Sequence, residues 1–254
     1  MLKKAVLAAI LCTTASFASW DLFPVLENHK GQTRFTTSYT TYTQDDNHYH
    51  ALSFYLASRY TVIPDLELAL NVPYNAFAYY GGNEYGIEGT GKISFWTRYQ
   101  FIPSMNVFAD IYLPERKVYS ADSWLFNIGL QFSRQINPLF NFGSELALTF
   151  STKDDYGDIP FSVDATIELD FNVTEKFSPY IRTFASLELG EYTDDQGYQF
   201  SHGGGDFYLS SYLGATYDFN KTFSIDASAG IAKWVNVDNC PIFIDANLMF
   251  LFNF

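Results

Sequence analysis

The sequence predicts an all-β protein: a twelve-stranded antiparallel transmembrane β-barrel with both termini on the periplasmic side. Three observations lead to this prediction. Segments of about 10 to 14 residues alternate apolar and polar side chains, the period of a strand with two unlike faces. Short turns and long loops separate these segments in strict alternation. After the N-terminal leader, no apolar stretch is long enough for a membrane-spanning helix.

The N-terminus has the pattern of a secretory signal peptide. Lys3 and Lys4 form a basic start, an apolar stretch follows, and small residues surround a cleavage position after Ala18. Cys12 follows Leu11, where a lipoprotein signal would have a small residue, so no lipid anchor is predicted. The predicted division of the chain is a signal peptide at 1–18, a periplasmic segment or small plug at 19–32, and the barrel at 33–254.

Composition narrows the possible partners. The chain has 28 acidic residues against 15 basic ones, and two of the basic residues lie in the leader. Phosphate binding needs basic surface, so nucleic acid is not a predicted partner. Once the leader is removed, Cys240 is the one remaining cysteine, and no disulfide can form within the chain.

Twelve strands follow from the alternation. They are expected at 33–43, 49–62, 66–78, 92–101, 105–114, 124–136, 139–151, 159–171, 177–189, 206–219, 222–234 and 242–254. Turn formers mark the short connections at 63–65, 102–104, 137–138, 172–176 and 220–221. The long polar loops are expected near 44–48, 79–91, 115–123, 152–158, 190–205 and 235–241. Outer-membrane barrels have short periplasmic turns and long external loops, which predicts the orientation of this chain.

The strand from 161 to 171 shows the two faces clearly. Val163, Ile167 and Leu169 share one face, whereas Asp164 and Glu168 share the other. In a membrane barrel the apolar face contacts lipid and the polar face lines the bore. The rival fold is a soluble sandwich or barrel with the apolar face inside, but soluble strands are usually only about five or six residues long.

The last strand ends the chain on an aromatic residue. Phe250, Phe252 and Phe254 lie on its apolar face. This strand resembles the closing strand of bacterial outer-membrane barrels, whose assembly machinery reads a terminal Phe as part of its signal. The resemblance implies the barrel-assembly machinery as a partner, and outer-membrane lipid and lipopolysaccharide as surroundings, in a Gram-negative bacterium.

Charged side chains of both signs are predicted on the inward face. Twelve tilted strands give a backbone diameter of about 24 Å, and side chains narrow the gap to roughly 10 Å. The expected lumen network consists of Glu67, Arg98, Asp110, Glu145, Asp164, Glu168 and Arg182. Such a network either braces a narrow barrel or forms a charged constriction that selects solutes.

Aromatic side chains are predicted on the same inward face. Tyr180, Phe184, Tyr208 and Tyr212 lie on neighbouring strands and should form one patch, with Trp96 and Trp234 elsewhere on the wall. This patch either suits a small apolar or aromatic solute or fills space in the lumen. The apolar segment 20–26 either tucks into the periplasmic mouth, against Phe243, Met249 and Leu251, or remains a free tail.

Catalysis and metal binding are not predicted. The histidines are His29, His48, His50 and His202, all in or beside expected loops or tails. His48 and His50 near Asp45 and Asp46 would suit a base or metal ligands, and Ser201 beside His202 is a distant nucleophile candidate. No recognisable motif surrounds them, so the prediction is no enzyme, no metal and no cofactor.

Three segments carry a family resemblance. They are IPDLELALNVPY at 63–74, GIEGTGKISFWTRYQF at 86–101 and NVFADIYLP at 106–114. With the later strand order, they resemble the outer-membrane family of the MetA pathway of phenol degradation, also described as transporter-like barrels. Lys92 follows Gly91 where members often have an aspartate. The resemblance implies passive uptake of small hydrophobic or aromatic molecules.

The predicted function is therefore a passive outer-membrane channel for small solutes, with hydrophobic or aromatic compounds favoured. The alternative is a non-conducting structural or surface-interaction barrel. A lipid-directed outer-membrane enzyme is the third possibility.

Overall fold

The computed structural model describes residues 25–44, 47–84, 88–114, 123–152, 161–189, 191–193 and 199–254. Twelve long strands form one antiparallel barrel. They are β1 (Gly31–Gln44), β2 (Asn47–Ile63), β3 (Leu66–Tyr80), β6 (Ser94–Ile102), β7 (Met105–Tyr112), β8 (Leu125–Asn137), β9 (Phe140–Ser151), β10 (Phe161–Phe171), β11 (Phe177–Leu189), β14 (Phe207–Asp218), β15 (Phe223–Trp234) and β16 (Phe243–Asn253). The long connections contain β4 (Asn83–Glu84), β5 (Gly89–Thr90), β12 (Glu191–Thr193) and β13 (Gln199–Gly203). Among the described residues, no helix is long and apolar enough to cross a membrane.

The sheet closes because its first and last strands pair. Each long strand pairs with its neighbour in the chain, and β1 also pairs with β16 from Gln32↔Asn253 to Thr41↔Ile244. At the end of the seam, the amide of Gly31 donates to the carbonyl of Phe254 at 2.8 Å, and the amide of Phe254 donates to the carbonyl of Gly31 at 2.9 Å. A closed sheet leaves no unpaired edge, which hydrocarbon requires because it offers no hydrogen bonds.

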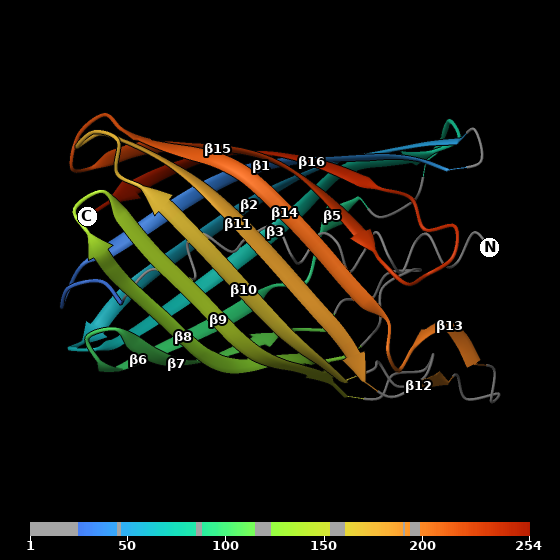
Figure 1. The fold of residues 1–254 in the computed structure, drawn as a ribbon, viewed down its shortest axis with the longest axis horizontal. Coiled ribbons are helices and arrows are strands. Elements are labelled where there is room, and N and C mark those ends of the chain that lie inside the picture. The colour runs from blue at the N-terminus through green and yellow to red at the C-terminus, as the bar shows by residue number, and fades with distance from the viewer. Residues whose placement is uncertain are drawn as a thin grey trace.

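The two ends of the barrel differ. In Figure 1 the barrel axis is roughly horizontal, with the short turns and the C-terminus at the left and the long connections, including β12 and β13, at the right. We call these the short-turn end and the long-loop end. The predicted twelve strands are confirmed, and their bounds differ from the predicted ones by no more than two residues.

The outward direction of the apolar face is also confirmed. On β10, Ile167 is 51% exposed, whereas Asp164 and Glu168 are 7% and 1% exposed. The same alternation runs along β9, where Leu146 is 57% exposed and its neighbour Ala147 is buried. A soluble sandwich or barrel would bury Ile167 and expose the carboxylates, so that alternative is wrong.

Exposed aromatic side chains gather toward both ends of the outer surface. At the short-turn end they include Phe171, Phe177, Tyr217, Phe219 and Phe252. At the long-loop end they include Tyr74, Tyr79, Phe95, Trp124 and Phe161. Two aromatic girdles around an apolar band are typical of barrels in the outer membrane, where the rings lie at the level of the lipid head groups.

Lys92 lies outside the strand in which it was predicted. β6 begins at Ser94, and the Lys92 ammonium instead donates to the carbonyl of Ser123 at 3.3 Å. The pairing of β3 with β6 ends at Asn71↔Ser94. Two residues on, Pro73 has no amide hydrogen for a strand ladder, and its carbonyl accepts from the amide of Gly91 at 3.0 Å. The ladder therefore ends before it reaches Lys92.

We expect a charge at the middle of the lipid-facing surface to destabilise the folded barrel. Leu146 lies at the centre of β9 and faces outward. Leu146→Arg should lower the free energy of unfolding in lipid vesicles by about 2–4 kcal/mol. Urea unfolding followed by tryptophan fluorescence measures the loss, with Leu146→Ala as the control for lost apolar area. Equal stability of the two variants would contradict the outward orientation.

Candidate functional site in the barrel bore

Buried ion pairs cross between neighbouring strands inside the barrel. The Nη1 atom of Arg59 on β2 lies 3.4 Å from the Oε1 atom of Glu67 on β3, and both side chains are at most 6% exposed. Arg98 on β6 pairs with Asp110 on β7 through both carboxylate oxygens. Arg182 on β11 pairs with Glu168 on β10, its partner in register. Each pair joins adjacent strands, so these contacts link β2 to β3, β6 to β7 and β10 to β11.

The remaining members of the predicted charged set accept hydrogen bonds from neutral side chains. Glu145 accepts from the amide of Gln131 at 2.7 Å. Asp164 accepts from Ser162 at 3.1 Å, and also from Thr149 and Ser186 on the two flanking strands. The seven predicted residues thus form several local contacts along the wall rather than one cluster.

Charge is distributed unevenly around the bore. On their inward faces, the described side chains of the strands from β9 to β16 contribute one base, Arg182, against several buried or half-buried acids: Glu145, Asp164, Glu168, Asp170, Glu188, Asp218, Asp226 and Asp245. The strands from β1 to β7 contribute Arg34, Arg59 and Arg98 against Glu67 and Asp110. One wall therefore carries most of the carboxyl groups of the bore.

Aromatic side chains gather inside the barrel at the long-loop end. We call this group the aromatic cluster; it comprises Tyr42, Tyr49, Tyr80, Phe184, Tyr208, Trp234 and Phe243. Tyr42 stacks on Tyr49 with ring centroids 4.7 Å apart and meets Phe243 edge-on at 4.8 Å. The ring centroids of Tyr208 and Trp234 are 5.2 Å apart. The rings come from seven strands, β1 to β3, β11 and β14 to β16, and line one side of the bore at this end.

The predicted aromatic patch is divided in the structure. Phe184 and Tyr208 belong to the aromatic cluster, with ring centroids 6.0 Å apart, and Trp234 joins them. Tyr180 and Tyr212 are also buried, but their hydroxyls bind carboxylates. Trp96 lies elsewhere, and the Cζ atom of Arg34 is 5.5 Å from the centroid of its ring.

Tyr180 and Tyr212 each form the same three-strand unit. Tyr180 on β11 lies over Gly214 on β14 and donates to Asp226 on β15 at 2.9 Å. A Cβ atom at Gly214 would overlap the Tyr180 ring. A glycine in a strand often marks such a close approach. The ring can lie against the wall only because the glycine has no side chain.

The second unit repeats this arrangement one strand further on. Tyr212 on β14 lies over Gly230 on β15 and donates to Asp245 on β16 at 2.9 Å. Asp245 also accepts from Thr40 on β1 at 2.6 Å. We call the two arrangements the Tyr–Gly–Asp units. The second unit extends to the seam, because Thr40 and Asp245 lie on the strands that close the barrel.

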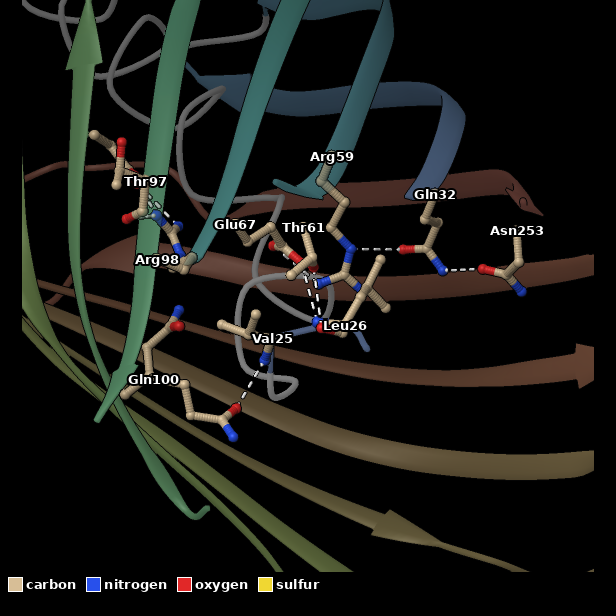
Figure 2. Close-up of polar contacts among 12 residues, drawn as sticks. Val25, Leu26, Gln32, Arg59, Thr61, Glu67, Thr97, Arg98, Gln100 and Asn253 are labelled. Atoms are coloured by element: carbon tan, nitrogen blue, oxygen red, sulfur yellow. Dashed lines mark hydrogen bonds and ion pairs between the residues drawn. The ribbon is translucent and has the colours of Figure 1, made fainter. Parts of the chain in front are cut away.

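The chain before β1 enters the bore at the short-turn end. Figure 2 shows Val25 and Leu26 among the inward side chains of β2, β3 and β6. The amide of Val25 donates to Gln100 and the amide of Leu26 donates to Glu67, both at 3.2 Å. The hydroxyl of Thr61 donates to the carbonyl of Leu26 at 3.0 Å. For Val25 and Leu26 the partners thus differ from those predicted, and Phe243 lies at the opposite end in the aromatic cluster. The rest of the predicted segment, residues 20–24, lies outside the described residues.

The other predicted candidates lie outside the bore or beyond the described side chains. His48, His50 and the terminal phenylalanines Phe250, Phe252 and Phe254 occupy outward positions. His29 precedes β1, with its Nδ1 atom 3.5 Å from the Tyr60 hydroxyl. Asp45 and Asp46 lie outside the described residues, and the side chains of Ser201 and His202 lie outside the described part of the structure.

Several residues of the bore were not predicted as site residues. Tyr42 and Tyr49 share the inward face with Arg34 and Arg59, so alternation along their strands could have identified them. Gly214 and Gly230 face inward too, but only the strand register places a tyrosine over each. Gln100 and Thr61 required knowledge of where the chain enters the barrel.

Comparison with solved structures places the fold among outer-membrane β-barrels. A COG4313 outer membrane channel from Pseudomonas putida F1 matches with a TM-score of 0.72 at 13% identity, covering 91% of this chain and 98% of that one. The translocator domain of the autotransporter NalP from Neisseria meningitidis gives 0.57 at 10% identity, over 99% and 97% of the two chains. The CymD monoaromatic hydrocarbon channel gives 0.55 at 8% identity, over 90% and 89%.

The sequence also identifies the family. The model for the putative MetA-pathway of phenol degradation matches residues 90–250. That match spans more than half of the chain, which therefore belongs to this family, and the predicted resemblance is confirmed. No curated protein matches the sequence.

We expect a side chain at Gly230 to disrupt the second Tyr–Gly–Asp unit. Gly230→Ala should displace the Tyr212 ring and weaken its hydrogen bond to Asp245, lowering the free energy of unfolding by about 1–3 kcal/mol. Urea unfolding in vesicles measures the change. Ala229→Val adds apolar volume on the lipid-facing side of the same strand and should leave stability nearly unchanged. If both variants behave alike, Gly230 does not serve this close approach.

Proposed function

We propose that the barrel is a passive channel of the outer membrane for small hydrophobic or aromatic molecules. The observation that carries the proposal is the aromatic cluster, which lies inside the barrel at the long-loop end. Apolar rings on the inner wall give an apolar or aromatic solute favourable contacts that a polar bore would not offer. The proposal assigns transport rather than catalysis to this chain.

The comparisons support this proposal at two levels. The family to which the chain belongs is described as the putative MetA-pathway of phenol degradation, and phenol is an aromatic compound. The related folds include a COG4313 outer membrane channel and a monoaromatic hydrocarbon channel. These proteins and this chain share a barrel architecture, and the aromatic cluster is the feature of this chain that suits the same class of solute.

We also propose the orientation and the route of assembly. Outer-membrane barrels have short turns on the periplasmic side. The short-turn end of this barrel would therefore face the periplasm, together with residues 25–30 and Phe254. The aromatic cluster would then lie toward the outside, near lipopolysaccharide. Phe250, Phe252 and Phe254 on the outward face of the last strand would serve as the signal for the barrel-assembly machinery.

We infer that the segment around Val25 and Leu26 narrows the bore at the short-turn end. Its backbone lies beside β2, β3 and β6, and its amides donate hydrogen bonds to the side chains of Gln100 and Glu67. A hydrogen-bonded segment of this kind limits the passage of water and ions, while the rest of the wall remains lined by the ion pairs. The charged network would then brace the barrel around the segment.

Aromatic uptake should depend on the aromatic cluster. Cells that carry Tyr208→Ala/Trp234→Ala should take up labelled toluene several-fold more slowly than cells with the unchanged protein, because the variant removes two inward rings. Phe95→Ala/Tyr79→Ala removes two rings from the outer surface at the same end and serves as the control. Heat-modifiable mobility in gels verifies that both variants fold. Equal uptake by the two variants would contradict the proposal.

Removal of the N-terminal segment should increase ion flow. A chain without residues 19–26 should show a larger single-channel conductance in planar bilayers, since the contacts with Gln100 and Glu67 are lost. A chain with Val25→Ala/Leu26→Ala keeps the backbone hydrogen bonds and should conduct like the unchanged protein. No current from any of the three would favour the non-conducting structural barrel instead.

A further inference from the structure

His48 and His50 lie side by side on the outer face of β2. Alternate residues of a strand share one face. Tyr49, between them, points inward and is 2% exposed within the aromatic cluster. Its burial fixes both imidazoles on the outside of the barrel. Their ring centroids are 6.2 Å apart, with an angle of 27° between the ring planes.

Hydroxyl groups on the neighbouring strand β1 hold the same nitrogen of each ring. His48 Nδ1 lies 2.9 Å from the hydroxyl of Thr43. His50 Nδ1 lies 2.7 Å from the hydroxyl of Tyr39 and 3.2 Å from that of Thr41. A hydroxyl can accept as well as donate, so both rings can carry their proton on Nδ1. Each Nε2 lone pair is then available, and within the described residues neither Nε2 atom has a hydrogen-bond partner.

This pattern matches the way in which proteins prepare imidazole for metal binding. A metal-bound histidine usually has its second ring nitrogen held by an oxygen, which fixes the orientation of the ring. A metal about 2.1 Å from Nε2 lies roughly 3.2 Å from the ring centre. Two rings on one ion can therefore have centroids no more than about 6.4 Å apart. The separation of 6.2 Å falls within this limit.

The location gives a dissolved cation access to the pair. A tilted strand needs about 9–11 residues to cross the hydrocarbon layer. β1 has 14 residues and β2 has 17, so their shared hairpin end projects beyond that layer. His48 is exposed and His50 is half-buried. The excess of 28 acidic over 15 basic residues in the chain also attracts cations.

We propose that His48 and His50 form a two-imidazole site for a late first-row divalent ion: Cu²⁺, Ni²⁺ or Zn²⁺. Imidazole suits these ions, whereas Ca²⁺ and Mg²⁺ require oxygen ligands. The described residues contain no group of three or more His, Cys, Asp or Glu side chains that could hold an ion. Water therefore completes the coordination shell. The affinity should be highest for Cu²⁺, following the usual order for nitrogen ligands.

Calorimetric titration of the folded full-length mature barrel in detergent micelles tests the site, with Cu²⁺ and Ca²⁺ as probes. We expect one Cu²⁺ per chain and no response to Ca²⁺. His48→Ala and His50→Ala should each weaken Cu²⁺ binding at least about tenfold, and the double variant should abolish it. His29→Ala removes a histidine at the short-turn end and should bind Cu²⁺ like the unchanged protein.

Two further variants separate metal binding from a purely structural role of the histidines. Thr43→Val removes the hydroxyl that holds His48 Nδ1, and Tyr39→Phe removes the nearer of the two hydroxyls that hold His50 Nδ1. Both variants leave the two ligands in place, so each should weaken Cu²⁺ binding without a change in heat-modifiable mobility. Undiminished binding by the His48→Ala/His50→Ala chain, or equal binding of Ca²⁺, would overturn the proposal. A failure of Cu²⁺ binding would leave the channel proposal intact, because single-channel conductance is measured independently on the same variants.

Discussion

The closure of the sheet between β1 and β16 is the constraint on which the rest of this structure depends. Hydrocarbon supplies no hydrogen bonds, so each backbone group within it must pair with a neighbouring strand. Once the seam from Gln32↔Asn253 to Thr41↔Ile244 is formed, every long strand has two neighbours and two unlike faces. Apolar side chains then contact lipid, and the ionisable side chains of the wall can only point inward.

The inward face meets this requirement in two ways. Toward the short-turn end and the middle, charged side chains pair with one another or accept from hydroxyls and amides, as Arg182 and Glu168 do. At the long-loop end, the aromatic cluster covers the part of the wall formed by β1 to β3, β11 and β14 to β16, beside the buried Glu188. In the proposed orientation, a hydrophobic solute that enters from outside would meet the aromatic cluster before the ion pairs.

Much of the fold could be predicted because alternation is a local signal. The faces of β10 follow from a period of two, and turn formers such as Pro64 and Pro138 mark the strand ends. The contacts inside the bore could not be predicted in the same way. Tyr212 and Asp245 are 33 residues apart and meet across an intervening strand, which requires the register of three strands. Phe243 is different, because the predicted long loop at 235–241 already implied the long-loop end, so its assignment to the periplasmic mouth was wrong.

The Tyr–Gly–Asp units have a consequence for the accuracy of folding. Tyr180 reaches Asp226 only if β14 places Gly214 beneath the ring, so the bond depends on two strand registers at once. A slip of two residues in β14 keeps every side chain on its proper face, yet it would bring Tyr212 or Thr216 opposite Tyr180. The hydrophobic pattern is the same in the shifted alignment, so it does not disfavour the error. The side chain of Tyr212 or Thr216 would overlap the Tyr180 ring, whereas Gly214 leaves room for it. The glycine therefore favours one alignment among several that bury and expose the same faces.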